Sequence, residues 1–591
     1  MAWHALVKYL PMRSVLSKDL FGWADYLVLV LVLGVSLLVG LYYGCCGSRQ
    51  STDGEYLLGN KEMRMLPVAI SLIAGYISGI TLLGTPGDIY SYGTQYYAII
   101  LGIFFMSFAI NYLFLPVFTE LGVKSSYEYL QVRFRHRAVR TVSAFIFIFD
   151  EIITIPIYMY VPCLALEQVT TLSRMWTAPA VMLVCILYTG LGGLKAVVWT
   201  DAIQMCIFCL SLVLIFVLGT VSVGGFGVVF TAAHEGGRLE LFNVDLDPLQ
   251  RTTLWGAVIG GFMYWTGFNS VNQTCVQRYL SVPNLRTARR AVWVFSAGVV
   301  GIITFCTYIG LLMYAYFQDC DPLAAGIVGT SDQLLAHFVM RVEGKLPGLP
   351  GLFMAGVFAA ALSSISVSLN STAGVVLDDF WRSYASRSLT DTQAAVFAKA
   401  TCAAFGFVCV GLMMAMQNVE YIIQVAMTLT GIAAGTQFGL FSLGMFNPWA
   451  NYKGAIVGAV TSLLVVSWLS VGAQVMSMEG RISYPRLPTN VTGCDPPVVP
   501  TPQPTTDPTV LSLYRVSYLW TASIGWLIVM IVGSLVSVVT GPDSPLDSKL
   551  AVFSPPVAAL LRRGRPDAGQ DAAAAAAAGS TVTLAEKGTR L

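Results

Sequence analysis

Residues 66–81 read Leu-Pro-Val-Ala-Ile-Ser-Leu-Ile-Ala-Gly-Tyr-Ile-Ser-Gly-Ile-Thr, an apolar run whose second half is interrupted by small and polar residues. With its continuation it reaches the length of about 20 residues that a membrane-spanning helix needs. Gly75 and Gly79 lack a Cβ and permit a local break in that helix. A break exposes carbonyls that can coordinate a hard cation and a helix N-terminus that can face an anion. The alternative interpretation is close helix packing through small residues.

Apolar runs of this kind recur along the whole chain, which has 591 residues, 56% hydrophobic and 11% charged, and a mean hydropathy of +0.69. A soluble protein of this length could not cover so much apolar surface with polar groups. We therefore predict an all-α polytopic protein of the lipid bilayer. The net charge of +2 argues against a nucleic-acid partner. About thirteen spans are predicted, roughly over residues 24–44, 66–85, 97–118, 141–163, 176–194, 197–220, 253–275, 291–317, 350–376, 393–415, 419–445, 453–473 and 517–540.

Basic residues set the predicted orientation, because cytoplasmic loops are enriched in Lys and Arg. With the N-terminus outside and the C-terminus in the cytoplasm, the loops within 120–140 and 276–290 carry their arginine clusters on the inner side. The triplet Asn490-Val491-Thr492, an N-glycosylation acceptor, then lies in the long outer loop. We expect a plasma-membrane protein that is glycosylated at Asn490.

Cysteine and histidine indicate little chemistry. Of the twelve Cys, only Cys320 and Cys494 fall in predicted outer loops. Either the two pair as a disulfide or they remain free thiols. The four His share no metal-ligand spacing. No nucleophile elbow or P-loop is present, which argues against an enzyme or an ATP-driven pump.

The ninth predicted span is rich in hydroxyl groups. Residues 359–372 read Ala-Ala-Ala-Leu-Ser-Ser-Ile-Ser-Val-Ser-Leu-Asn-Ser-Thr. A single serine in a membrane helix usually bonds to its own backbone, but so many polar groups at this depth need further partners. The adjacent hydroxyls of Ser363 and Ser364 suit a small hard cation, which prefers oxygen ligands.

Two further segments place charges beside spans. In Gly-Gly-Leu-Lys-Ala-Val-Val-Trp-Thr-Asp, residues 192–201, Asp201 stands near the start of a span, where a carboxylate must cap a helix, pair or bind a cation. In Val-Asn-Gln-Thr-Cys-Val-Gln-Arg-Tyr-Leu, residues 271–280, we predict that Arg278 is a cytoplasmic-side anchor.

Together these segments resemble the sodium/solute symporter family, over about residues 55–448. The chain is most similar to the thirteen-span branch that holds the monocarboxylate, multivitamin and iodide carriers. Further shared segments are Gly-Thr-Pro-Gly at 84–87, Ala-Leu-Glu-Gln-Val-Thr at 165–170 and Gly-Met-Phe-Asn-Pro-Trp-Ala-Asn at 444–451.

The resemblance implies a leucine-transporter-like fold of two inverted five-helix repeats around a site at the membrane midplane. The implied division of the chain is 1–65, an outer N-terminus, first span and inner loop; 66–220, repeat one; 221–252, an outer loop; 253–446, repeat two; 447–540, spans twelve and thirteen with the glycosylated loop; and 541–591, a disordered cytoplasmic tail.

The resemblance also implies the coupling ion and the site residues. One Na⁺ would be bound by the carbonyls of Ala74, Ile77 and Ala360 and the hydroxyls of Ser363 and Ser364. A second Na⁺ would lie near Ser78, Thr81 and Tyr160, and the substrate would contact Tyr76, Thr81, Tyr160, Trp265 and Asn269. Thr81 and Asn269 replace a Gln and a Tyr of the iodide carrier, which argues against iodide. Asp150 and Glu151 are a departure from this branch: they either face an aqueous cavity beside the coupling ions or are neutralised by protons.

The expected function is sodium-coupled import of a small organic anion, a monocarboxylate or a carboxylate vitamin, by alternating access. The alternatives are a non-transporting nutrient sensor and a symporter of another solute such as iodide or choline. The chain ends in Thr589, Arg590 and Leu591, a pattern that PDZ domains bind. An unread end of the tail is the other interpretation of those three residues.

Overall fold

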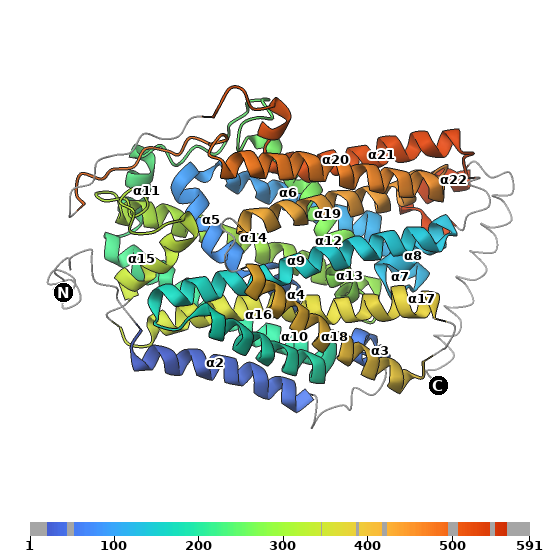
Figure 1. The fold of residues 1–591 in the computed structure, drawn as a ribbon, viewed down its shortest axis with the longest axis horizontal. Helices are drawn as coiled ribbons and strands as arrows, with labels where there is room; N and C mark the ends of the chain where they lie inside the picture. The colour runs from blue at the N-terminus through green and yellow to red at the C-terminus, as the bar shows by residue number, and fades with distance from the viewer. Residues whose placement is uncertain are drawn as a thin grey trace, which may run out of the picture.

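The computed structural model describes residues 21–43, 53–343, 346–385, 389–416, 422–494, 506–543 and 550–563, and within these ranges it is helical, without a strand. Most of the long helices run side by side along the long axis of the molecule (Figure 1). Nine of the described helices are long and apolar enough to cross a membrane, or ten if the bent pair of α4 and α5 is one span. This is the all-α, polytopic architecture predicted from the sequence.

Each predicted span coincides with helical structure. The corresponding elements are α2 (Trp23–Leu41), α4 (Met65–Tyr76) with α5 (Gly79–Tyr92), η3 (Thr94–Ala98) to α6 (Ile99–Ala109), η4 (Ile110–Phe114) and α7 (Leu115–Leu121), α9 (Arg137–Val169), α10 (Arg174–Val223), η5 (Gly256–Gly260) to α12 (Gly261–Val271) and α13 (Gln273–Tyr279), α14 (Leu285–Tyr316), α16 (Leu349–Val375) with η7 (Val376–Trp381), α18 (Asp391–Met416), α19 (Ile422–Phe446), α20 (Tyr452–Met478) and α21 (Thr521–Val539).

Shorter helices lie mainly at the two ends of the bundle. They are α3 (Asp53–Leu58), η2 (Gly59–Lys61), α8 (Ser126–Phe134), α11 (Phe226–Glu235), η6 (Ser331–Gln333), α15 (Leu334–Glu343), α17 (Arg382–Tyr384), η8 (Ser512–Arg515), η9 (Tyr518–Trp520), η11 (Leu550–Val552) and α22 (Pro555–Arg563). In Figure 1, α11 and α15 mark one end, and α3, α8 and α17 mark the other.

Helix α10 covers the fifth and sixth predicted spans in one element of 50 residues. A straight helix of that length would measure about 75 Å, more than twice the thickness of the hydrocarbon core of a bilayer. Its backbone breaks at Gly193, where φ is 58° and ψ is −159°. Glycine adopts this positive φ without a Cβ clash. The break therefore separates the element where the sequence predicts a loop between two spans.

The first helix of each predicted repeat is also interrupted. Helix α4 ends at Tyr76, and Ile77 is extended (φ −75°, ψ 100°) before α5 begins. The axes on the two sides of this break differ by 56°. A second break, which the sequence analysis missed, falls at Asn272 (φ −65°, ψ 134°), whose side chain caps α13 by accepting from the Thr274 amide. Asn272 itself could have indicated this break, because Asn is a preferred N-cap residue and its side chain can accept from the amide two residues later.

Helix α16 lies at the centre of the bundle. In its most apolar window 94% of the residues are buried, against 22% in α2. It packs against α2, α4, α9, α10 and α18. The hydroxyl-rich face of residues 363–371 is therefore inside the protein rather than in contact with lipid.

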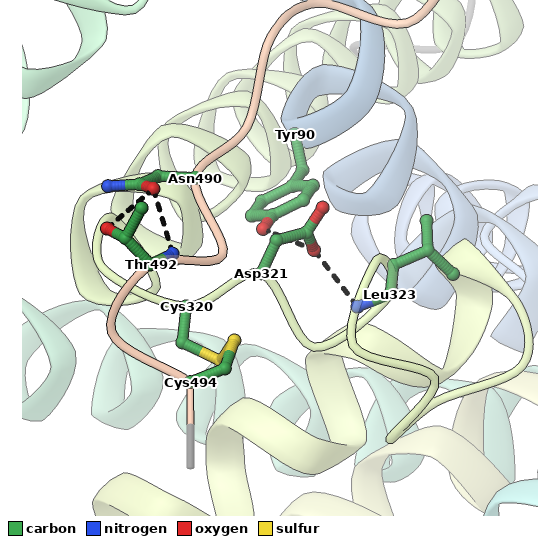
Figure 2. The surroundings of a disulfide bond; sticks show 7 residues. All are labelled: Tyr90, Cys320, Asp321, Leu323, Asn490, Thr492 and Cys494. Carbon is green, nitrogen blue, oxygen red and sulfur yellow. Dashed lines mark hydrogen bonds between the residues drawn. A yellow bond between two sulfur atoms is a disulfide. The ribbon is translucent and has the colours of Figure 1, made fainter. Parts of the chain in front are cut away.

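A disulfide closes the end of the molecule that carries α11 and α15, which we call the disulfide end. Cys320, beyond α14, is bonded to Cys494 with a Cα–Cα distance of 4.9 Å, which decides between the two alternatives for these cysteines (Figure 2). Beside the bond, the Tyr90 hydroxyl donates to Asp321 (2.8 Å), and the Asp321 amide donates to the Asn490 carbonyl (2.9 Å). The long loop after α20 is thus attached to the far end of α5.

Candidate functional site

The serine pair of α16 meets the broken end of α4. The Ser363 hydroxyl donates to the carbonyls of Ala74 (2.7 Å) and Ala360 (2.9 Å). The Ser364 hydroxyl donates to the carbonyls of Gly75 and Ala360, each at 3.2 Å. Because α4 ends at Tyr76, the carbonyls of its last turn lack partners further along the helix. Oxygen atoms of two helices that are far apart in the sequence therefore converge at the break.

A narrow cavity lies at this point. Ala74, Ile77, Ala360 and Ser363, four of the five residues predicted to bind sodium, line it together with Gln204, Met205, Phe208 and Ala359. The fifth, Ser364, bonds to the Ala360 carbonyl at its edge. Main-chain carbonyls and hydroxyls are the ligands that a hard cation prefers. The donor set therefore fits Na⁺.

Gln204 is a residue that the sequence analysis left without a role. It lines the same cavity, is buried, and its amide donates to Ser36 of α2 (3.0 Å). Its carbonyl oxygen has no hydrogen-bond partner among the described residues. A buried acceptor without a partner carries a desolvation cost that a cation or water would relieve. The sequence offered one indication of a role for Gln204: it lies one helical turn after Asp201 in the same apolar span.

A buried ion pair lies against α4, just before the break. Arg278 is 2% exposed, and its guanidinium lies 3.4 Å from the carboxylate of Asp201, which is fully buried. Asp201 also accepts from the Ser71 hydroxyl (2.6 Å), and Arg278 donates to the Ser71 carbonyl. The prediction that Arg278 serves as a cytoplasmic-side anchor is wrong, because this side chain is buried and pairs with Asp201. Of the three roles considered for Asp201, which were helix capping, pairing and cation binding, the structure shows pairing.

The ion pair also explains Gly75. A Cβ on this residue would lie 2.5 Å from Nη1 and 2.7 Å from Nη2 of Arg278. Real Cβ atoms do not approach that closely, so only glycine lets the guanidinium cross the helix here. The ion pair and Ser71 therefore connect helices α4, α10 and α13 next to the cavity.

The residues predicted to contact substrate fall into two groups. The rings of Tyr76 and Trp265 lie 4.0 Å apart between centroids, with Phe268 edge-on to Tyr76 at 5.9 Å. The indole nitrogen of Trp265 is buried and has no partner among the described residues. Asn269 is buried too, but its amide donates to the Trp265 carbonyl of its own helix (2.8 Å). Aromatic rings thus form one wall beside the helix break.

The second group comprises Thr81 and Tyr160, which with Ser78 are also the residues predicted to hold a second Na⁺. Ser78 is the N-cap position of α5, and Thr81 lies in the first turn of that helix. The Tyr160 hydroxyl accepts from Arg174 (3.0 Å) at the start of α10. Within the described part of the chain, no hydrogen bond joins Tyr160 to Ser78 or Thr81. Helix α5 does approach α9 closely, because a Cβ on Gly79 would lie 3.3 Å from Pro162.

Asp150 and Glu151 lie on α9, and both are buried, with exposures of 6% and 4%. Thr154 donates to Asp150 (3.4 Å) and bonds to Thr430 of α19 (3.2 Å). No Lys or Arg of the described ranges forms an ion pair with either carboxyl group. Carboxyl groups buried without a cation are costly, so they mark a polar strip inside the bundle. Both alternatives for this pair, contact with coupling ions and neutralisation by protons, stay open.

Comparisons with known proteins agree with this geometry. The model of the Sodium:solute symporter family matches residues 56–462. The sodium-coupled monocarboxylate transporter 2 of Homo sapiens is 34% identical, over 91% of this chain and 87% of its own length. The sodium-dependent multivitamin transporter of Oryctolagus cuniculus is 37% identical, over 88% and 83%. The solved structure of a Na⁺-coupled sialic acid symporter, substrate-bound and outward-open, matches 89% of this chain and all of its own, with a TM-score of 0.74 and 25% identity.

Proposed function

This chain belongs to the sodium:solute symporter family, and we propose that it imports a small organic anion, a monocarboxylate or a carboxylate vitamin, together with sodium. It is a multi-pass membrane transporter rather than an enzyme, and Na⁺ is its coupling ion. The observation that carries the proposal is the convergence of Ser363 and Ser364 on the broken end of α4. In the proposed cycle, residues 66–220 and 253–446 move relative to one another around this point.

The geometry beside the cavity supports an anionic solute. The N-terminus of α5 begins directly after the break, and helix N-termini attract anions through their free N–H groups. The Tyr76–Trp265 wall provides apolar contact for a carbon skeleton. We propose that the carboxylate faces the start of α5 near Ser78 and Thr81, and that the rest of the solute packs on the rings. The two relatives compared above are named for monocarboxylates and vitamins, which agrees with this assignment.

Uptake measurements test the proposed solute. In cells expressing the chain, we expect sodium-dependent accumulation of L-lactate, biotin or pantothenate, but not of iodide or choline. If two Na⁺ accompany one monovalent anion, one net charge enters per cycle, worth about 2.3 kcal/mol per 100 mV. Substrate should then evoke an inward current under voltage clamp. Uptake of iodide or choline alone would contradict the proposal, and binding without any uptake would favour a sensor.

We further propose that the disulfide end faces outward at the plasma membrane. Asn490 is exposed there, and Thr492 completes the glycosylation triplet beside it. Asn490→Gln should therefore abolish the mobility shift that peptide N-glycosidase produces on a gel, because the acceptor amide is lost. The control is Asn284→Gln, which changes the N-cap of α14 at the other end. A wild-type protein without a glycan, although it reaches the surface, would contradict this orientation.

The proposed PDZ-binding sequence, Thr589 to Leu591, lies outside the described residues, as does all of the chain after Arg563. It stays a prediction. Deleting these three residues is its direct test, with surface retention as the measurement.

A further inference from the structure

An arginine lies beyond the aromatic wall, toward the disulfide end. Arg251 stands in the segment that precedes η5 and forms an ion pair with Asp88 of α5. The proposed substrate site lies at the N-terminus of the same half-helix, so Arg251 holds the end of α5 that points away from that site.

Arg251 is surrounded by aromatic rings. Its guanidinium carbon lies 4.1 Å from the ring centroid of Tyr92, 5.4 Å from that of Tyr518 and 5.6 Å from that of Tyr484. Ser517 donates to its carbonyl (2.6 Å), which fixes the backbone. The rings come from the end of α5, the long loop after α20 and η9. Three separate parts of the chain thus hold one cation in place.

The guanidinium is only partly used. Nη2 forms an ion pair with one carboxylate oxygen of Asp88, and Nε has no hydrogen-bond partner among the described residues. Nε and Nη2 form one edge of the guanidinium, which binds a carboxylate with two parallel hydrogen bonds. That edge is half occupied. The side chains of Arg251 and Asp88 are 26% and 20% exposed, whereas Nε itself is buried, so a solute would meet the pair first at the exposed part of the guanidinium.

A second carboxyl group, that of Asp332, lies near Asp88, and burial, with the charge of Asp88, raises the pKa of the Asp332 carboxyl above its ordinary value. Asp88 is the carboxylate that would compete with a solute for Arg251, because it already pairs with Nη2. Asp88 sits on α5, the same half-helix whose N-terminus lies at the proposed substrate site. Release of Asp88 therefore frees the outer end of α5 from this contact.

We propose that Arg251 is an outer docking site for the carboxylate of the transported solute, which exchanges with Asp88 before the solute moves inward. This inference rests on the proposed function, since it requires an anionic solute. It assigns Arg251 to substrate recognition and Asp88 to competition with the substrate. The two residues of one ion pair should then have opposite effects when they are neutralised.

Uptake of L-lactate and biotin by Arg251→Gln and Asp88→Asn at saturating sodium tests this prediction. Arg251→Gln should raise the half-saturating solute concentration about tenfold, because a bidentate contact is lost. Asp88→Asn should lower it about threefold, because the competing carboxylate is gone. The sodium dependence should not change in either variant. Arg481→Gln, which removes a charge from the exposed pair with Asp507 in the same loop region, is the matched control and should match the wild type.

If both variants raise the half-saturating concentration, the pair is a structural contact and the docking site is overturned, while the proposed function stands. If Arg251→Gln fails to reach the surface by biotinylation, Asp88→Asn decides alone: a lower value supports docking and a higher value overturns it. If the wild-type protein takes up no carboxylate, the proposed function fails and the docking site falls with it.

Discussion

Replacing both Ser363 and Ser364 by Ala is expected to raise the sodium concentration for half-maximal uptake by about 100-fold, or to abolish coupled uptake. Two of five proposed ligands are lost, and a loss of about 1.4 kcal/mol per hydroxyl corresponds to about tenfold each. A cation that has shed its water has few replacements for these oxygens. The measurement is the sodium dependence of uptake, normalised to the amount of protein at the surface.

Thr307→Val is the control for this double variant. The Thr307 hydroxyl donates to the Ile303 carbonyl of its own helix (2.8 Å), so its removal also deletes a membrane hydroxyl, but away from the cavity. It should leave the sodium dependence unchanged. A double serine variant with wild-type sodium dependence would show that the cavity at α4 and α16 does not hold the coupling ion.

Arg278→Met is expected to destabilise the protein by about 3–5 kcal/mol, because it leaves the Asp201 carboxylate buried without its cation. We expect a lower melting temperature of the purified protein in detergent and less protein at the cell surface. Adding Asp201→Asn should restore a large part of the loss, since no charge then remains to be neutralised. The side-chain amide introduced by this second substitution could still accept from Ser71, whose hydroxyl lies 2.6 Å from the native carboxylate.

An exposed arginine provides the control, because its loss removes the same charge without leaving a buried carboxylate unpaired. Arg286 is exposed in the first turn of α14, so Arg286→Met should change stability by no more than about 0.5 kcal/mol. If Arg278→Met is as stable as Arg286→Met, Arg278 is the surface anchor that the sequence suggested. If the double variant is less stable than Arg278→Met, Asp201 has a further partner that matters more than the arginine.

Features that depend on neighbours in the sequence could be predicted without the structure. The spans follow from hydropathy, because a segment in a bilayer must be apolar and must satisfy its own backbone hydrogen bonds. The break in the second span follows from Gly75, Ser78 and Gly79. The shared face of Ser363 and its neighbours follows from helical periodicity. That this face meets the broken helix was predicted from the family resemblance, because hydropathy alone does not show which spans are neighbours.

The sequence therefore determined the class of protein, its spans and the place of the serines proposed to bind sodium, since each of these is encoded locally or in a motif. Only the tertiary structure decided which buried polar groups meet. Asp201 and Arg278 come from different helices. Asp88 of α5 pairs with Arg251 of a distant loop, and the disulfide joins Cys320 and Cys494 of two further segments. A charge at membrane depth requires a partner, but nothing in its local sequence names that partner. The choice depends on how distant helices pack, and it placed Arg278, predicted to be a cytoplasmic-side anchor, in a buried ion pair near the proposed sodium cavity.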